Sequence, residues 1–93
     1  MIYSFKDKDA QELYERGTNR RYKSFERVAL RKLKKIAGAK QIETLRLPSG
    51  NHLEALVGDR KGQWSIRVND KWRLCFRWSD KSAKDVEIVD YHH

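Results

Sequence analysis

Hydrophobic and polar residues alternate through most of the second half of the chain. Alternation with a period of two is typical of β-strands that bury one face. The pattern predicts four strands: Leu53 to Val57; Trp64, Ile66 and Val68; Trp72, Leu74, Phe76 and Trp78; and Asp85 to Val89. The turn residues Leu47-Pro48-Ser49-Gly50-Asn51 predict a loop before the first of these strands.

The beginning of the chain contains the signals of a short strand and a short helix. The strand is expected over Ile2 to Phe5. Asp9 is the expected cap of the helix, because Glu12 follows three residues later in the capping-box position. Gly17 is expected to end this helix.

A longer helix is predicted from about Asn19 to Ala37, with Thr18 or Asn19 as its cap and Gly38 after it. Apolar residues recur within it at intervals of three and four, which is typical of one helical face. They are Tyr22, Phe25, Ala29, Leu33 and Ile36. A basic stripe lies on the opposite side. It consists of Arg20, Lys23, Arg27, Arg31 and Lys34. We therefore expect one side of the helix to pack on a sheet and the other to face solvent.

The order of the predicted elements is β-α-α-β-β-β-β. This order favours an α+β fold with a mostly antiparallel sheet and two N-terminal helices packed on it. A length of 93 residues fits one domain, 1–93. Because 39% of the residues are hydrophobic, the chain has enough apolar material for a folded core.

The connection between the second and third alternating runs is constrained by their apolar faces. A two-residue loop pairs Ile66 with Arg73, which puts apolar residues of one strand and polar residues of the other on the same face of the sheet. A three-residue loop, Asn69-Asp70-Lys71, pairs Ile66 with Leu74 instead. We therefore predict the three-residue loop. Such a loop needs a left-handed residue, and because none of the three is glycine we expect some backbone strain.

The three-residue loop places Arg67 directly opposite Arg73 on the other face of the sheet, with Arg77 further along the same strand. Opposed like charges destabilise a sheet by up to about 1 kcal/mol. A bound phosphate explains the arrangement, because guanidinium binds phosphate in a bidentate manner. In the alternative, the arginines splay apart or pair with carboxylates of the last strand: Asp85, Glu87 or Asp90.

The chain is strongly basic, with a net charge of +8 and an isoelectric point of about 9.8. From Arg16 to Lys40 there are ten Lys or Arg and one acidic residue, Glu26. Such density costs self-repulsion unless an anion neutralises it. The balance indicates a polyanionic partner, either nucleic acid, ribosomal RNA or an acidic protein. A solvated basic face without any partner is the alternative.

Cys75 is the only cysteine, so no intramolecular disulfide can form. It falls on the polar face of the predicted sheet without an acid–base neighbour in sequence, and we expect it to be a bystander. The sequence has no Cys/His pattern for zinc, and we expect no metal and no cofactor. It also has no apolar stretch long enough for a signal peptide or a membrane span, which favours a cytoplasmic protein.

The C-terminal residues Asp90-Tyr91-His92-His93 combine a carboxylate, a phenol and imidazole. Imidazole titrates near neutral pH and therefore suits proton transfer. A phosphodiester can be cut without a metal when a 2′-hydroxyl is deprotonated and attacks in line. The extra negative charge must then be stabilised and the leaving 5′-oxygen protonated. Arg73 beside His92 has the chemistry for these steps. A fraying tail without a catalytic role is the alternative.

Several short segments together point to a family. They are Ile2 to Phe5, Pro48-Ser49-Gly50-Asn51, Leu53-Glu54-Ala55-Leu56, Gly58-Asp59-Arg60, Trp64 to Asn69, Trp72 to Phe76, and Asp90-Tyr91-His92. With these motifs, over essentially the whole chain, the sequence resembles the HigB toxins of the RelE/ParE superfamily, the plasmid-maintenance killer toxins. The block from Ser65 to Phe76 combined with the Asp-Tyr-His end is the most specific part of the resemblance.

The resemblance implies a compact RelE-like fold and a ribosome-dependent endonuclease that cuts mRNA in the A site without a metal. It implies a HigA-type antitoxin with a helix-turn-helix domain, which holds the toxin inactive and alone contacts operator DNA. It also implies binding to the 70S ribosome. On this interpretation the basic helix, Arg67 and Arg77 contact phosphates of ribosomal RNA and mRNA.

The resemblance further assigns roles to single residues. His92 matches the general acid or base, and Arg73 matches the strand arginine near the scissile phosphate. Asp90 is expected to orient His92, and Tyr91 to stack on a base or position the nucleotide.

The chain departs from the family just before its Gly-Asp segment. Some HigB members carry a His and a Lys there, where this chain has Glu54-Ala55-Leu56-Val57. His52 is the nearest imidazole and is the candidate for the second acid–base group. A loop histidine with no proton role is the alternative.

Two other functions are compatible with the same fold. ParE-like relatives poison DNA gyrase and need no catalytic acid–base set. The Asp-Tyr-His ending disfavours that function, whereas the missing His/Lys pair favours it. The other function is that of a non-toxic RNA-binding protein.

Overall fold

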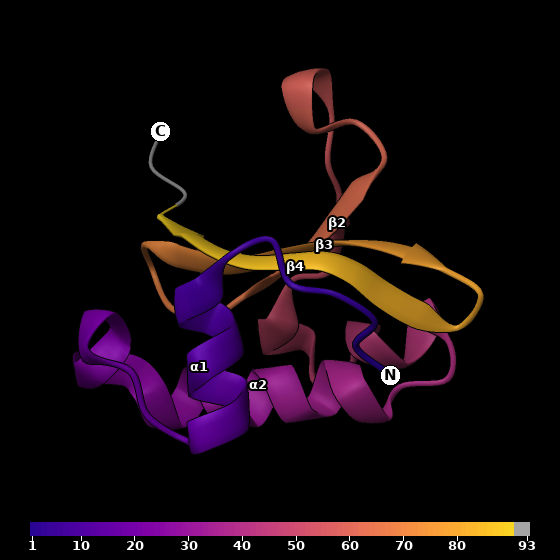
Figure 1. The fold of residues 1–93 in the computed structure, drawn as a ribbon. Coiled ribbons are helices and arrows are strands. Elements are labelled where there is room, and N and C mark those ends of the chain that lie inside the picture. Colours follow the sequence, from indigo (N-terminus) through magenta and orange to yellow (C-terminus); the bar gives the residue numbers. More distant parts are fainter. Residues whose placement is uncertain (91–93) are drawn as a thin grey trace.

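The computed structural model describes residues 1–90 and consists of a four-stranded sheet with two helices packed against one face (Figure 1). The helices are α1 (Lys8–Arg16) and α2 (Glu26–Gly38). The strands are β1 (Glu54–Ala55), β2 (Gln63–Arg67), β3 (Trp72–Ser79) and β4 (Ser82–Asp90), and they pair in this order with every pair antiparallel. Short 3₁₀ segments connect them: η1 (Arg20–Phe25), η2 (Ile42–Arg46), η3 (Ser49–Asn51) and η4 (Gly58–Arg60). The predicted α+β class is confirmed.

The strand predicted over Ile2 to Phe5 forms only two isolated bridges. Ile2 pairs with Ala83 and Phe5 with Val86, both parallel to β4. A regular ladder is interrupted between these bridges because β4 has an extra residue, Asp85, with φ of 53°. The amide of Asp85 donates instead to the Ser4 hydroxyl at 2.9 Å.

The lengths of two predicted strands are also corrected. The last strand begins at Ser82 rather than Asp85, because Asp80 and Lys81 both adopt positive φ and close a two-residue hairpin with β3. The strand predicted over Leu53 to Val57 is reduced to Glu54–Ala55.

Helix α1 begins two residues earlier than predicted. Its cap is Asp7, whose carboxylate accepts from the Asp9 amide at 2.9 Å, so the prediction of Asp9 as cap was wrong. Asp9 and Glu12 instead accept from the side-chain amide of Asn19, at 3.1 and 3.0 Å. Gly17 ends the helix with φ of 82°, as predicted.

The long helix predicted over 19–37 is divided into η1 and α2. Asn19 caps η1, the backbone of η1 is kinked at Tyr22, whose φ is −109°, and α2 begins after Phe25, whose φ is −135°. The Tyr22 hydroxyl donates to Asp7 at 2.7 Å, which draws this residue towards α1. At the start of α2 the carboxylate of Glu26 accepts from the Thr18 hydroxyl at 2.8 Å. The chain therefore satisfies these polar groups across the break instead of continuing one helix.

The core lies between the helices and the sheet. Tyr22, Ala29, Leu33 and Ile36 are fully buried, and Phe25 is partly buried against the same cluster, so the predicted apolar face is confirmed. Strands β2 to β4 contribute the other side of the core: Ile66, Val68, Leu74, Phe76, Ala83, Val86 and Ile88. The ring of Trp72 closes one end, 5.7 Å from the ring centre of Tyr22.

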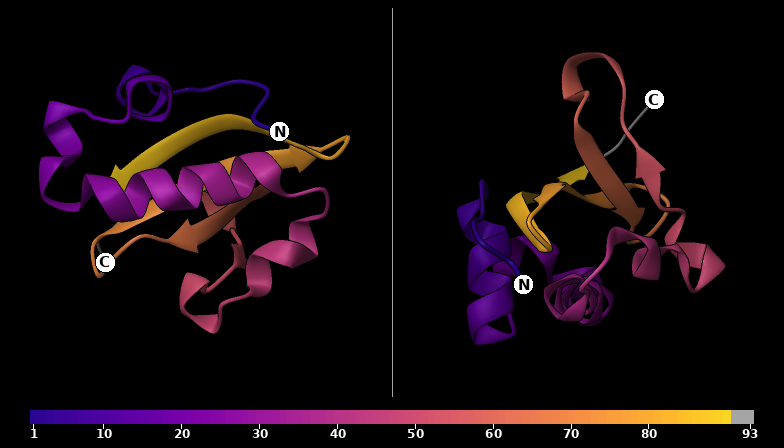
Figure 2. Two further views of the ribbon diagram at one scale, coloured as in Figure 1. Left: turned by 90° about the horizontal axis from the view of Figure 1, so that it is seen from below. Right: turned by 90° about the vertical axis from the view of Figure 1, so that its right-hand side faces the viewer.

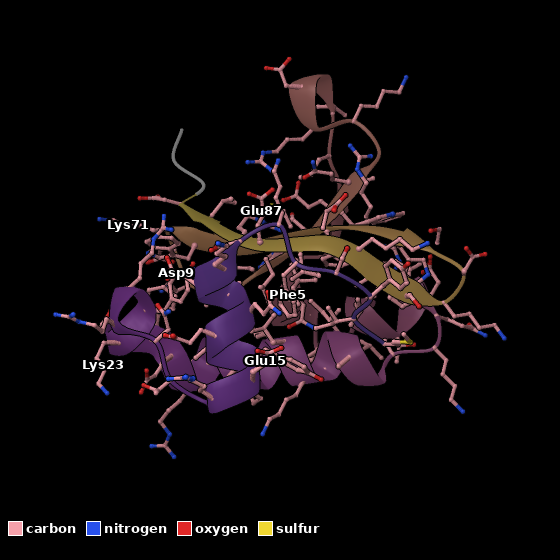
Figure 3. All side chains as sticks on the ribbon, in the orientation of Figure 1. Phe5, Asp9, Glu15, Lys23, Lys71 and Glu87 are labelled. Carbon is pink, nitrogen blue, oxygen red and sulfur yellow. The ribbon has the colours of Figure 1, made fainter. Side chains whose placement is uncertain are left out.

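The opposite face of the sheet, away from the helices, has a smaller buried patch. Ser65 and Cys75 pair across β2 and β3 and are both fully buried. Glu87, labelled in Figure 3, is paired with Cys75 across β3 and β4 and forms an ion pair of 3.3 Å with Arg60. Burial raises the pKa of the Cys75 thiol to about 11. The location of Cys75 is consistent with a structural role only.

The Asp7 carboxylate links three parts of the fold, because it accepts hydrogen bonds from the Asp9 amide of α1, the Tyr22 hydroxyl and the Ile88 amide of β4. We therefore expect its loss to destabilise the protein. Asp7→Ala removes a helix cap, worth about 1 kcal/mol, and leaves the buried Tyr22 hydroxyl without its acceptor, at a cost of about 1–3 kcal/mol. We expect the free energy of unfolding in urea to fall by about 2–4 kcal/mol. Tyr22→Phe is the control, with an expected loss of about 1 kcal/mol. Equal losses in the two variants would contradict this assignment.

Burial of the Cys75 thiol should make it slow to react in the folded protein. A pKa of about 11 leaves about one thiol in a thousand ionised at pH 8, and only the thiolate reacts. We expect Cys75 to react with a disulfide reagent at least about 100-fold more slowly in the native protein than in denaturant. A Cys75→Ser, Ser49→Cys variant is the control, because Ser49 is exposed. Similar native rates at positions 75 and 49 would show that the thiol is accessible.

Candidate active site

The β2–β3 hairpin determines which side chains reach the face of the sheet away from the helices. Ile66 pairs with Leu74, and both are fully buried in the core. Arg67 is therefore opposite Arg73 on the other face, and the predicted register is confirmed. The three-residue loop is confirmed as well, because the Val68 amide donates to the Trp72 carbonyl at 2.9 Å.

The strain predicted for this loop is not observed. Within residues 1–90, the non-glycine residues with positive φ are His52, Asp80, Lys81 and Asp85, and none of them belongs to the loop. The Asn69 side chain closes the turn instead, since its oxygen accepts from the amides of Lys71 and Trp72, each at 2.9 Å. The hydrogen bonds of the Asn69 side chain thereby close the turn without a residue in the left-handed conformation.

Arg73 is held by three polar partners from different segments. Its Nε donates to the Ser65 hydroxyl at 2.9 Å, and its Nη2 donates to the His52 carbonyl at 2.7 Å. The same Nη2 lies 3.0 Å from a carboxylate oxygen of Glu54. The side chain is only 12% exposed. The guanidinium group is therefore fixed in orientation, as anion recognition requires.

The other two arginines of this face point elsewhere. Arg67 turns towards the hairpin loop, where it donates to the Asn69 carbonyl and pairs with Asp70. Arg77 pairs with Asp85 at 3.9 Å. The like charges are thus relieved by splaying and by carboxylates. Of these carboxylates only Asp85 is one of the last-strand partners expected from the sequence. The three arginines do not form one cluster.

Arg67 and Arg73 nevertheless line one hollow of about 480 Å³, together with His52, Leu53 and Glu54. Two arginines, a histidine and a glutamate thus line one open space. Cations can stabilise a phosphodiester as its charge increases, and the carboxylate and imidazole can move protons. The hollow therefore has the groups that phosphodiester cleavage requires.

Glu54 is a member of this hollow that the sequence interpretation did not select. Its pairing with Ser65 puts its side chain on the same face as Arg67 and Arg73. The available signal was its position, since Glu54 begins the segment in which some of the resembling toxins are expected to carry a His and a Lys.

His52 is positioned by the turn before β1. It has φ of 46°, and its amide donates to the Ser49 carbonyl at 3.1 Å. The preceding Asn51 is fully buried, and its side-chain amide donates to the carbonyls of Leu45 and Leu47, each at 3.2 Å. The proton role predicted for His52 stays a prediction, and its carbonyl has the further role of binding Arg73.

The end of β4 approaches this region through its pairing with β3. Val89 is opposite Arg73, and Asp90 is opposite Trp72 and exposed. The predicted catalytic residues Tyr91 and His92, and His93, lie outside the described residues. The predicted proximity of His92 to Arg73 therefore stays a prediction.

The predicted basic stripe is exposed but belongs to two elements. Arg20 and Lys23 lie on η1, whereas Arg27, Arg31 and Lys34 lie on α2. Lys23 projects from the outer side of η1 (Figure 3) and pairs with Glu26 at 3.5 Å. Only Arg31 and Lys34 are near the turn that precedes β1, where they line a groove with Pro48 and Asn51.

Two absences are observed within residues 1–90. No three His, Cys, Asp or Glu side chains in this part of the chain come together as a set of metal ligands. None of its helices has the length and apolar character to cross a membrane.

The sequence is similar to those of known bacterial toxins. Over 90 residues, and 95% of each chain, the sequence is 42% identical to toxin HigB-1 of Vibrio cholerae serotype O1. It is 35% identical to endoribonuclease HigB of Proteus vulgaris, over 99% of this chain and 100% of that protein.

Solved structures of two other toxins share the fold. A YafQ mutant from E. coli has a TM-score of 0.59 at 20% identity, over 97% of this chain and 93% of that chain. The YoeB–YefM complex from Staphylococcus aureus has a TM-score of 0.57 at 16% identity, over 100% of this chain and 99% of that chain. The family model of HigB, described as the RelE-like toxin of a type II toxin–antitoxin system, matches residues 3–92. The chain therefore belongs to the HigB-like toxins, which are RelE-like toxins of type II toxin–antitoxin systems.

Proposed function

We propose that the protein is an endoribonuclease that cuts mRNA on the ribosome, using its own side chains and no metal. The observation that carries this proposal is the guanidinium group of Arg73, fixed by three partners in a hollow that also contains Glu54 and His52. The name of the Proteus vulgaris relative, an endoribonuclease, supports the reaction class. A net charge of +8 supports binding to ribosomal RNA, whose phosphates are the dominant source of affinity.

The proposed reaction is an in-line transfer within the RNA. The 2′-oxygen loses its proton to a base and forms a bond to phosphorus, while the bond from phosphorus to the 5′-oxygen breaks. An acid protonates the 5′-oxygen, and the products are a 2′,3′-cyclic phosphate and a 5′-hydroxyl end. Arg73 stabilises the charge that develops on the phosphoryl oxygens.

Glu54 is the proposed base of this reaction. Its carboxylate lies 3.0 Å from Nη2 of Arg73 before RNA binds. When a phosphate takes its place at the guanidinium, the carboxylate is released beside the scissile linkage and can accept the 2′ proton. His92 is the proposed acid, with Asp90 orienting it and Tyr91 contacting a base. His52, which also lines the hollow, is the proposed alternative to His92.

A HigA-type antitoxin is the proposed inhibitor, and operator DNA is bound through that protein alone. The toxin–antitoxin family supports an antitoxin partner, and the Staphylococcus aureus YoeB structure is itself a complex with YefM. The proposed place of action is the cytoplasm, where ribosomes translate mRNA.

Arg73→Gln and His92→Ala test the reaction directly. We expect each to reduce the rate of mRNA cleavage on programmed ribosomes by at least about 100-fold, through loss of charge stabilisation or of proton transfer. Arg16→Gln, an exposed arginine on α1, is the control and should cut at the wild-type rate. Equal cutting by the wild type and an Arg73→Gln, His92→Ala double variant would remove the assignment.

Glu54→Gln tests the base while keeping the side-chain volume. We expect kcat to fall by about 100-fold or more, with loss of the acidic limb of the pH–rate profile. A role in holding Arg73 alone predicts a changed KM with an unchanged pH profile. Glu15→Gln, on the exposed side of α1, is the matched control.

The two other functions compatible with the fold are separated by different assays. A gyrase poison inhibits DNA supercoiling by purified gyrase and leaves mRNA on programmed ribosomes intact. A harmless RNA-binding protein permits growth when it is expressed without an antitoxin.

A further inference from the structure

A groove between α2 and the turn that contains η3 gathers four cations of α2. In the view from below in Figure 2, α2 crosses under the sheet and the segment with η2 and η3 continues beside it. The groove has a volume of about 480 Å³ and is lined by Pro48, Asn51 and four basic residues. The basic residues are Arg31, Lys32, Lys34 and Lys35.

The positive charge of this groove is not balanced within the described part of the chain. No carboxylate of residues 1–90 lies within ion-pair distance, 4.0 Å, of any of the four cations. On the sheet the situation is the opposite, because Arg67, Arg73 and Arg77 each pair with a carboxylate. The groove is therefore a favourable place for an external anion.

Lys32 is held inside the groove rather than extended into solvent. It is half-buried, and its ammonium group donates to the side-chain oxygen of Asn51, which is itself fully buried. Burial lowers the pKa of Lys32, and the neighbouring charges of Arg31, Lys35 and Arg67 lower it further. A fixed ammonium with a neutral partner and three cationic neighbours is costly unless an anion is present.

The groove neighbours the candidate active site. Asn51 lines the groove, and the next residue, His52, lines the hollow. Arg67 of the hollow is close enough to Lys32 to affect its protonation. A polymer with regularly spaced negative charges is long enough to contact both places, whereas a single small anion contacts only one.

We propose that this groove binds backbone phosphates of the RNA strand whose scissile linkage occupies the hollow. The inference rests on the proposed RNA-cleaving function, since it takes RNA as the polyanion. Proximity to the hollow favours RNA over an acidic peptide, because in the proposed function the hollow takes a phosphodiester of an RNA strand whose other phosphates lie nearby. Lys32 and Lys35 thus gain a role that the predicted basic stripe did not include.

The test measures binding without cleavage. The probe is a short fluorescent single-stranded RNA with 2′-O-methyl riboses, which lack the attacking hydroxyl, and its anisotropy is followed between roughly 0.05 and 0.2 M salt. We expect Lys32→Gln, Lys35→Gln to reduce the slope of log K against log salt by about 1.4, or about 0.7 for each lost phosphate contact. This change corresponds to an affinity about 25-fold lower at 0.1 M salt.

Two further variants make the result decisive. Lys34→Gln, Lys35→Gln leaves the Lys32–Asn51 hydrogen bond intact and should weaken binding similarly, so an effect on folding is separated from one on binding. Lys8→Gln, Lys81→Gln removes two exposed charges elsewhere and is the matched control. Groove variants that bind RNA like this control overturn the proposal. So does selective loss of poly-glutamate binding with RNA binding unchanged, which indicates an acidic protein partner. Because the probe cannot be cleaved, failure of the nuclease assay leaves this result interpretable.

Discussion

The pairing register of β2 with β3 is the constraint on which both the core and the candidate site depend. Ile66 and Leu74 are buried under the helices, and this burial determines that Arg67 and Arg73 emerge on the other face. A slip of one residue would exchange the two sets. It would expose two large apolar side chains, whose burial contributes about 1.5–3 kcal/mol each to stability. It would also place charged groups in the core, at a desolvation cost of several kcal/mol for each group. Core packing thus fixes the geometry of the charged face.

The same constraint explains which parts of the fold could be predicted. Alternation in β2 and β3 allowed only one hairpin register, and the three- and four-residue spacing in α2 identified its buried face. The turns were less predictable, because they depend on side chains that reach backbone groups. Asn69 closes the hairpin with its own oxygen, and the Tyr22 hydroxyl finds Asp7, fifteen residues earlier, where the predicted helix breaks. No local pattern encodes such a long-range bond.

The candidate site was predictable to the extent that it follows from that register. Arg73 was identified because β3 is long and strongly patterned, and the cationic face was recognised with it. Glu54 was missed because β1 has two residues, both exposed, so alternation contains no information about its partner strand. The direction of the Arg67 side chain could not be predicted, because the nearby carboxylate of Asp70 pairs with it. The sequence thus allowed the arginines of this face to be identified, but not the carboxylates of Glu54 and Asp70 that pair with them.

Strand β4 also joins the two halves of the sequence. Ser4 accepts from the amide of Asp85, a separation of 81 positions, and the amides of Tyr3 and Lys6 donate to Ala83 and Val86. Contacts this distant in sequence form late, because the entropy of closing so long a loop opposes them until both partners exist. During synthesis, the arginine-bearing strand therefore lacks its outer neighbour, and the N-terminal segment lacks its anchor, until β4 has left the ribosomal exit tunnel. The charged face is consequently assembled only after β4 has emerged.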